Sequence, residues 1–328
     1  MQPLKLSVAA LLAAGMLQAP ALAQSQAPKV RGLIQTWYTA DESALDAFTV
    51  RRVFLYVNGA VTPQLDYSVL FNPAKYLSQP TVTGTTSPFN VSNTGDTRIL
   101  EDAFLTAKLD GGWKVRMGQF RPPVSAEALA SAGRIPLARR ALFLEGNSFG
   151  FYRDIGLEVS KQALPGLTAT LGVFNGQTTN QRETNEGKDL AGRLDYSLAN
   201  LTLGASYLRG SRGAAAALTE RIGANAAVGL GALELSAEGL AGQDGAVSKL
   251  GWYGQALWRF LPAMNAVLRV EEWDADQATD GRQQDVTLGI NWFLAGNSKL
   301  ALNLINQTQV GPTPSRNGLA IVAWQLEL

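Results

Sequence analysis

The sequence contains no histidine and no cysteine, and only 17% of its 328 residues are charged. Without histidine, a Ser-His-Asp triad and the usual kinds of zinc site are excluded. Without cysteine, the chain has no disulfides, iron–sulfur clusters or thiol nucleophiles. Beyond the N-terminal 23 residues, no stretch of 18 consecutive apolar residues occurs, so the sequence predicts no membrane-spanning helix. We expect neither an enzyme nor a bound cofactor.

Residues 1–23 are typical of a secretory signal peptide. Lys5 supplies the positive charge, Leu6 to Met16 form a short apolar stretch, and Ala21-Leu22-Ala23 matches a cleavage site. An uncleaved membrane anchor is the alternative, but the apolar stretch is short for a membrane span. We predict export, cleavage before Gln24 and a single domain over 24–328 with no net charge.

What the chain does contain is alternation of apolar and polar residues. Segment 284–294 places one apolar set on one face and a polar set on the other: Val286, Leu288, Ile290, Trp292 and Leu294 against Asp285, Thr287 and Asn291. Segments 187–198 and 249–260 do the same. A period of two residues over 8–12 residues is the pattern of a half-buried strand, and we count about sixteen such segments.

The connections between these segments alternate between short and long. The long ones are mostly polar and fall at 40–47, 72–97, 121–153, 176–186, 209–217, 242–248, 274–282 and 309–317. Short turns at one end and long loops at the other are typical of an outer-membrane β-barrel with an even number of strands. We therefore predict an all-β fold, a transmembrane antiparallel barrel of about 16 strands with short periplasmic turns and long external loops.

The apolar strand faces need a partner, and no set of amphipathic helices is available to cover them. Lipid is the simplest partner, and closure into a barrel satisfies every backbone group. Most of the seven tryptophans fall near strand ends, which fits an aromatic girdle as well as ordinary sheet packing. The last strand, 318–328, repeats the alternation. We therefore predict an outer-membrane location with lipid as a partner.

Positive charge is concentrated between Gly111 and Arg153. This stretch has seven basic residues and two acidic ones, a net charge of +5, and much of it lies in the longest loop, 121–153. Prolines and apolar residues in this loop favour packing, so we expect it to fold into the lumen as a constriction. Rings of arginine or lysine select anions in pores. The predicted anion-binding residues are Lys114, Arg116, Arg121, Arg134, Arg139 and Arg140.

A second interpretation of the same arginines stays open. They could instead pair with carboxylates of the wall, such as Asp66, Asp102, Glu158 and Asp195, or bind lipopolysaccharide from outside. The acidic residues Asp274, Asp276 and Asp280 lack the rest of a calcium-loop pattern, and we interpret them as a solvated loop. Nothing in the sequence indicates nucleic-acid binding.

Four segments carry a resemblance to a known family: 51–59, 100–109, 113–129 and 153–160. The most specific is the strand end Gly118-Gln119-Phe120 with Arg121-Pro122 and Ser125-Ala126-Glu127. These segments resemble the phosphate-selective porin O and P family of bacterial outer membranes. The resemblance implies a 16-stranded, usually trimeric porin whose third external loop, here 121–153, lies inside the channel.

We therefore expect a porin for passive diffusion of small anionic or polar solutes, favouring anions such as phosphate and assembled as a homotrimer. Two alternatives remain open. One is a nonselective porin, in which acidic wall residues offset the basic stretch. The other is a structural or adhesive envelope barrel without transport.

Overall fold

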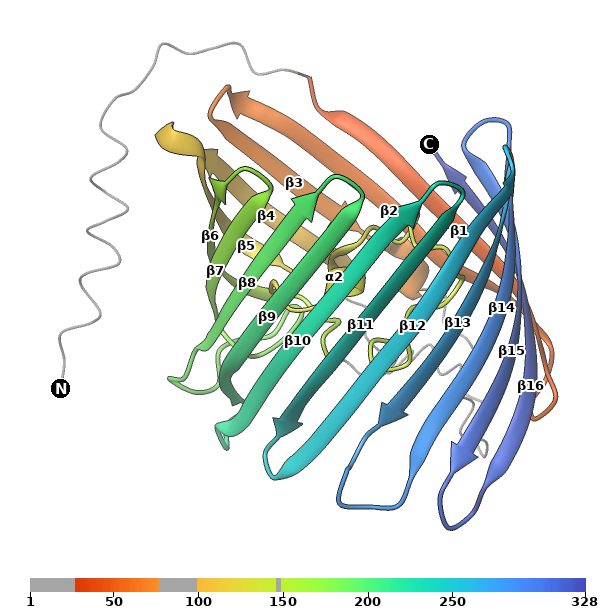
Figure 1. Cartoon of the computed structure of the whole chain (residues 1–328). Coiled ribbons are helices and arrows are strands. Elements are labelled where there is room, and N and C mark those ends of the chain that lie inside the picture. The colour runs from red at the N-terminus through yellow and green to blue at the C-terminus, as the bar shows by residue number, and fades with distance from the viewer. Residues whose placement is uncertain (1–26, 77–98, 146–148) are drawn as a thin grey trace.

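A computed structural model describes residues 27–76, 99–145 and 149–328. Within these residues sixteen antiparallel strands form one closed barrel (Figure 1). The predicted all-β class and strand number are confirmed. The strands are β1 (Lys29–Asp41), β2 (Ala47–Thr62), β3 (Leu65–Phe71), β4 (Leu100–Lys108), β5 (Trp113–Phe120), β6 (Asp154–Leu164), β7 (Leu167–Phe174), β8 (Asp189–Leu198), β9 (Leu201–Arg212), β10 (Ala217–Leu230), β11 (Leu233–Asp244), β12 (Val247–Leu261), β13 (Met264–Asp274), β14 (Arg282–Leu294), β15 (Ser298–Val310) and β16 (Ser315–Glu327).

Each strand pairs with its neighbours in sequence, and β16 closes the barrel on β1. The closing register runs from Leu33 opposite Glu327 to Asp41 opposite Leu319. The described helices are short: η1 (Pro73–Tyr76), η2 (Asp110–Gly112) and α2 (Ala126–Leu129). None of the helices in the described residues has the length and apolar character needed to cross a membrane.

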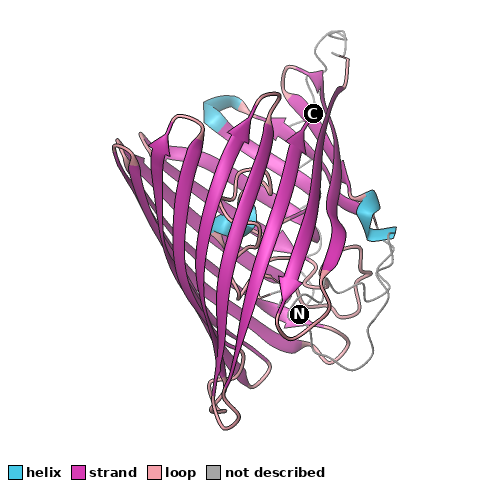
Figure 2. Cartoon of the chain, turned by 90° about the vertical axis from the view of Figure 1, so that its right-hand side faces the viewer, coloured by secondary structure: helices cyan, strands magenta, loops and turns pink. Residues whose placement is uncertain are grey.

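The predicted alternation decides which face of each strand turns outward. In β14, Val286, Leu288 and Ile290 are exposed on the outside, whereas Asp285 and Thr287 are buried on the inside. Because a barrel gives every strand the same two sides, the outer surface is an apolar belt and the inner surface is polar. Figure 2 shows how strands make up nearly all of the described chain.

The tryptophans divide between the two faces. Trp113, Trp258, Trp292 and Trp324 are exposed near the strand ends that adjoin short turns, and Trp252 is exposed further along β12. Trp37 and Trp273 are buried inside the barrel instead. The four exposed tryptophans at one rim therefore fit the aromatic girdle. The two buried tryptophans fit ordinary packing inside the barrel.

The longest connections between strands all lie at one rim of the barrel, and the other rim has only short turns. At one rim, which we call the short-turn rim, every connection has two to four residues; it is the upper rim in Figure 1. The opposite, long-loop rim carries 121–153. Three predicted long loops are wrong in length: 209–217 and 309–317 leave connections of four residues each, and β11 and β12 continue to Asp244 and Val247, so only a two-residue turn remains of 242–248. Backbone pairing extends these hairpins past the point where apolar alternation stops.

The wall of the barrel is uneven in height. Strands β3, β4 and β5 have 7, 9 and 8 residues, whereas β9 to β16 have 11 to 15. The low side therefore lies around β3–β5, and β7, with 8 residues, is short as well. The predicted signal peptide 1–23 and most of the predicted loop 72–97 lie outside the described residues.

Candidate functional site

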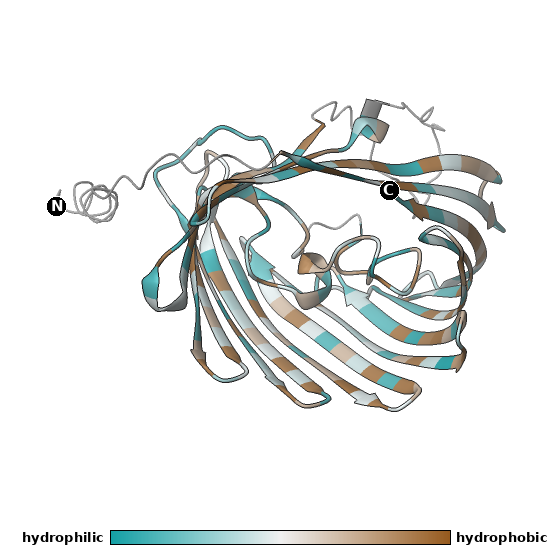
Figure 3. Cartoon of the chain, turned by 90° about the horizontal axis from the view of Figure 1, so that it is seen from above, coloured by the Kyte–Doolittle hydropathy of each residue, from teal (hydrophilic) through white to brown (hydrophobic). Residues whose placement is uncertain are grey.

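The described residues of the segment between β5 and β6, 121–145 and 149–153, lie inside the barrel. Figure 3 shows them and α2 within the ring of strands. Leu142, Phe143 and Leu144 are buried in one hydrophobic cluster with Leu208 and Leu240 of the inner wall. The apolar residues that suggested a packed loop are therefore the residues that pack it. We call this segment the inner loop.

Ion pairs and hydrogen bonds fix the inner loop to the far wall. The carboxylate of Glu238 on β11 accepts hydrogen bonds from the backbone N–H groups of Ala126 and Glu127, at 2.8 and 3.0 Å. Arg269 on β13 donates through both terminal nitrogens to the carboxylate of Glu127, at 3.2 and 3.0 Å. Ser125 caps α2 through its hydroxyl group. These contacts hold the start of the inner loop against β11–β13.

Further along, the inner loop contacts the strands next to the barrel closure. The side chain of Asn303 on β15 accepts from the N–H of Ala138 at 2.7 Å, and Lys299 donates to the carbonyl of Ile135 at 3.2 Å. Gln325 on β16 donates to the carbonyl of Gly133 at 3.1 Å. The inner loop thus crosses the lumen and is attached on both sides, which narrows the interior.

A cavity of about 340 Å³ remains between the inner loop and strands β1–β4. Its lining reaches from Asp102, near the long-loop end of β4, to Leu328, next to the short-turn end of β16. Four arginines line it: Arg31, Arg121, Arg134 and Arg153. We call it the arginine cavity.

The arginine cavity has an excess of positive charge. Its lining holds two acids, Asp102 and Glu327, beside the four arginines. Arg153 forms ion pairs with Asp102 at 2.6 Å and with Glu101 at 2.5 Å. Arg31 and Arg134 are exposed. A cation about 4 Å from an anion contributes on the order of a few kcal/mol at an effective dielectric constant near 20.

Two arginines of the inner loop also shape it. Arg121 and Arg140 each lie 4.6 Å from the ring centre of Phe151, and both donate to the carbonyl of Ala130. Burial lowers the pKa of Arg121, and the neighbouring Arg153 and Arg140 lower it further. Burial lowers the pKa of Arg140 to about 10, with Glu127 opposing the shift. The two guanidinium groups lie against the same aromatic ring.

The remaining predicted site residues lie elsewhere. Lys114 is exposed near the short-turn end of β5. Arg116 lies 3.6 Å from Glu158, and Arg139 lies 3.8 Å from Asp285. Of the six predicted residues, the structure thus brings Arg121 and Arg134 to the arginine cavity. Glu158 was one of the wall carboxylates expected to pair with these arginines, and it does pair with Arg116.

Sequence reasoning missed two further sets of basic residues. Arg31 shares the inner face of β1 with Leu33, so alternation could have identified it. Arg51 and Arg52 are adjacent and would be assigned to opposite faces, but a bulge in β2 leaves Arg51 unpaired with β1. As a result Arg51 contacts Glu145 of the inner loop while Arg52 donates to Gln35 inside the barrel.

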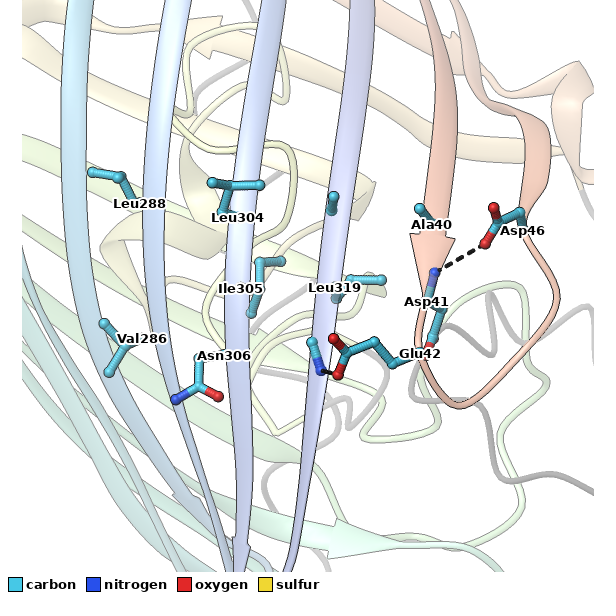
Figure 4. Close-up of a pocket in the computed structure, with 12 residues that line it drawn as sticks. Ala40, Asp41, Glu42, Asp46, Val286, Leu288, Leu304, Ile305, Asn306 and Leu319 are labelled. Atoms are coloured by element: carbon cyan, nitrogen blue, oxygen red, sulfur yellow. Dashed lines mark hydrogen bonds between the residues drawn. The ribbon is translucent and has the colours of Figure 1, made fainter.

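Among the other hollows in the described residues, one borders the lumen and one lies on the outer side. A cavity of about 680 Å³ near the short-turn rim is lined by three basic side chains, Arg134, Arg259 and Lys299, so Arg134 borders both cavities. The hollow in Figure 4 lies against the outward residues Leu288 and Leu304. Its carboxylates accept from the chain's own backbone, Glu42 from Gly318 and Asp46 from Asp41, so it is not part of the lumen.

Comparisons with known proteins agree with this architecture. The family model of phosphate-selective porin O and P matches residues 37–212 and 204–326. The anion-selective porin from Comamonas acidovorans has a TM-score of 0.68 at 12% identity, with 92% of this chain and 99% of that one covered. The outer membrane channel DcaP of Acinetobacter baumannii gives 0.64 at 11% identity, covering 95% and 100%. OmpT of Vibrio cholerae, in its trimer form, gives 0.63 at 11% identity, covering 92% and 99%. No curated protein sequence matches the chain.

Proposed function

The chain belongs to the phosphate-selective porin O and P family and forms an outer-membrane channel for passive diffusion, not an enzyme; we propose that this channel favours small anions over cations. The observation that carries the proposal is the arginine cavity. Four guanidinium groups border a narrow part of the lumen, and one of its two acids is already paired with Arg153. Positive charge in a narrow, partly dehydrated path attracts anions and repels cations.

A weakly selective channel is the second candidate. Several of the arginines first expected in the pore face carboxylates, as Arg116 does with Glu158 and Arg139 with Asp285. In each such pair the two opposite charges largely cancel, so little net electric field from the pair reaches a distant ion. The exposed arginines of the cavity, Arg31 and Arg134, are therefore the residues whose charge decides between the two functions.

The test is the reversal potential of single channels in a planar bilayer under a potassium chloride gradient. The native channel should show anion preference, and Arg31→Gln with Arg134→Gln should reduce the anion-to-cation permeability ratio by roughly three- to tenfold. Arg209→Gln is the control, because Arg209 is exposed on the outer face of β9 and its loss removes one positive charge, as each of the two cavity substitutions does. A native channel without anion preference would favour the second candidate.

We also propose that residues 1–23 direct export and are removed, and that the barrel works as a trimer in outer-membrane lipid. The support for a trimer is the low wall. Strands β3 and β5, with 7 and 8 residues, are shorter than the roughly 9–11 residues that a tilted strand needs to cross the bilayer, and β4, with 9, is at the lower end of that range. Packing of other copies against β3–β5 would shield this side, and OmpT of Vibrio cholerae, which shares the fold, has a trimer form.

A further inference from the structure

The lining of the arginine cavity combines guanidinium groups with apolar side chains. Among the lining residues, Leu33, Phe54, Leu70 and Ala132 form a hydrophobic cluster, with Tyr56 packed against it. Leu129 continues the apolar lining and is 40% exposed. This apolar surface lies inside the barrel, where lipid cannot cover it. A solute in the cavity therefore meets both apolar carbon and positive charge.

The arginines present their donors from fixed positions on aromatic rings. The guanidinium group of Arg31 lies 5.7 Å from the ring centre of Tyr56, and that of Arg121 lies 4.6 Å from Phe151. Stacking of this kind holds a planar guanidinium with its N–H edge free to meet a planar carboxylate. Two buried nitrogens, Nε of Arg121 and Nη2 of Arg153, have no acceptor among the described residues. The site thus supplies more donors than the protein satisfies.

Inorganic phosphate fits such a surface poorly. It carries charge on oxygens all around the central atom, and each oxygen turned toward an apolar wall would lose its water without gaining a donor. A carboxylate attached to an apolar body has its charge at one end only. Its body can bury against the leucines and Phe54 while its oxygens meet arginine, and each buried methylene contributes about 0.8 kcal/mol, close to fourfold in affinity.

Resting on the proposed anion preference, we infer that the solutes this cavity binds best are organic monocarboxylates with a compact apolar or aromatic body, in preference to inorganic phosphate. The cavity volume of about 340 Å³ is within the usual range of small-molecule sites. The second cavity repeats the combination, because Arg134, Arg259 and Lys299 there share the lining with Leu257, Phe260 and Phe293. Arg134 borders both, so a carboxylate can pass from one to the other without losing a cationic partner.

The experiment adds one probe anion at a time to single channels in potassium chloride and measures block of the chloride current. The probes are benzoate, acetate and inorganic phosphate at equal concentration and pH 7. For the native channel, we expect half-block by benzoate at a concentration at least about tenfold below those of acetate and phosphate. Equal or stronger block by phosphate would overturn the inference.

Two variants locate the effect on the apolar lining. Leu129→Asn and Tyr56→Ser, made separately, should each weaken block by benzoate by about fourfold or more. Leu45→Asn is the matched control, because Leu45 is 78% exposed in the connection 42–46 and does not line the cavity. Benzoate block that is unchanged in both variants would also reject the site.

The outcomes separate this inference from the proposed function. A channel that prefers chloride over potassium but discriminates poorly between benzoate and phosphate keeps the proposed function and loses the inference. A channel without anion preference loses both.

Discussion

Arginines of the inner loop that are close in sequence have different tasks. Arg134 is exposed between two cavities and offers its charge to solutes. Arg140 is 1% exposed, and its terminal nitrogens donate to the carbonyls of Glu127 and Ala130. The first guanidinium is available to permeating ions, whereas the second closes a turn. A loss of selectivity after removal of Arg140 would therefore not identify it as an ion-binding residue.

This difference makes a prediction about stability. Arg140→Gln should lower the free energy of unfolding by about 3 kcal/mol, because glutamine cannot satisfy both carbonyls and buried hydrogen bonds to charged groups contribute about 1.5–3 kcal/mol each. Arg134→Gln should leave it unchanged within about 0.5 kcal/mol. Denaturant unfolding in detergent, followed by circular dichroism, measures both. Equal stability of the two variants would mean that Arg140 does not hold the turn.

Alternation explains which individual residues the sequence reveals. Side chains along a strand alternate between the two faces, so the inward direction of Arg116, opposite Glu158, follows from the pattern. A bulge interrupts the period locally, which is why Arg51 could not be placed. The inner loop has no period at all. The direction of Arg139 depends on Asp285 of a distant strand and that of Arg140 on carbonyl groups of the loop itself, and no local pattern encodes either contact.

At the level of the element, the inner loop is held by a few buried polar contacts. The pair of Glu127 and Arg269 joins α2 to β13, and both side chains are almost fully buried. Glu238 receives the first backbone N–H groups of α2. Apolar packing around Phe143 supplies the rest, at a point where Gly251 of β12 leaves room that a Cβ atom would fill. Position and rigidity of the constriction thus depend on charges that never meet the solute.

Removal of one of these charges should loosen the constriction. Glu127→Gln leaves Arg269 buried without its counter-charge, which costs about 3–5 kcal/mol when a buried pair is broken. We expect a lower unfolding midpoint and larger fluctuations of single-channel current than in the native channel. Glu220→Gln is the control, since Glu220 faces outward and pairs with the exposed Arg209. Steady currents and an unchanged midpoint in Glu127→Gln would show that apolar packing alone holds the inner loop.

The existence of this element was predictable, but its partners were not. Length, the prolines at its start and its apolar residues distinguish 121–153 from the polar loops. Glu127 and Arg269, by contrast, are 142 residues apart, and nothing in either local sequence pairs them. The hairpin β11–β12 shows the same limit, because its extension to Asp244 and Val247 rests on pairing between strands that the hydrophobic pattern does not record.

For the whole molecule, the sequence was most informative. A period of two fixes the apolar face, the absence of covering helices leaves that face to lipid, and closure removes sheet edges. Those three steps lead to a barrel without any knowledge of individual contacts. The height of the wall was not predicted, because strand ends depend on where backbone pairing stops. The low side around β3–β5 is therefore information that the structure adds.

The low side leads to a prediction about assembly. Met117 on β5 is 61% exposed and points outward, and Ile222 on the tall strand β10 is 59% exposed. If copies pack through the low side, Met117→Arg places a charge in the interface between subunits, and light scattering in mild detergent should show monomers in place of trimers. Ile222→Arg should stay trimeric but insert less stably, since arginine on a lipid-facing strand costs about 2–4 kcal/mol near the bilayer midplane. Circular dichroism checks that both variants keep the barrel. A trimeric Met117→Arg variant together with a monomeric Ile222→Arg variant would place the interface on the tall wall instead.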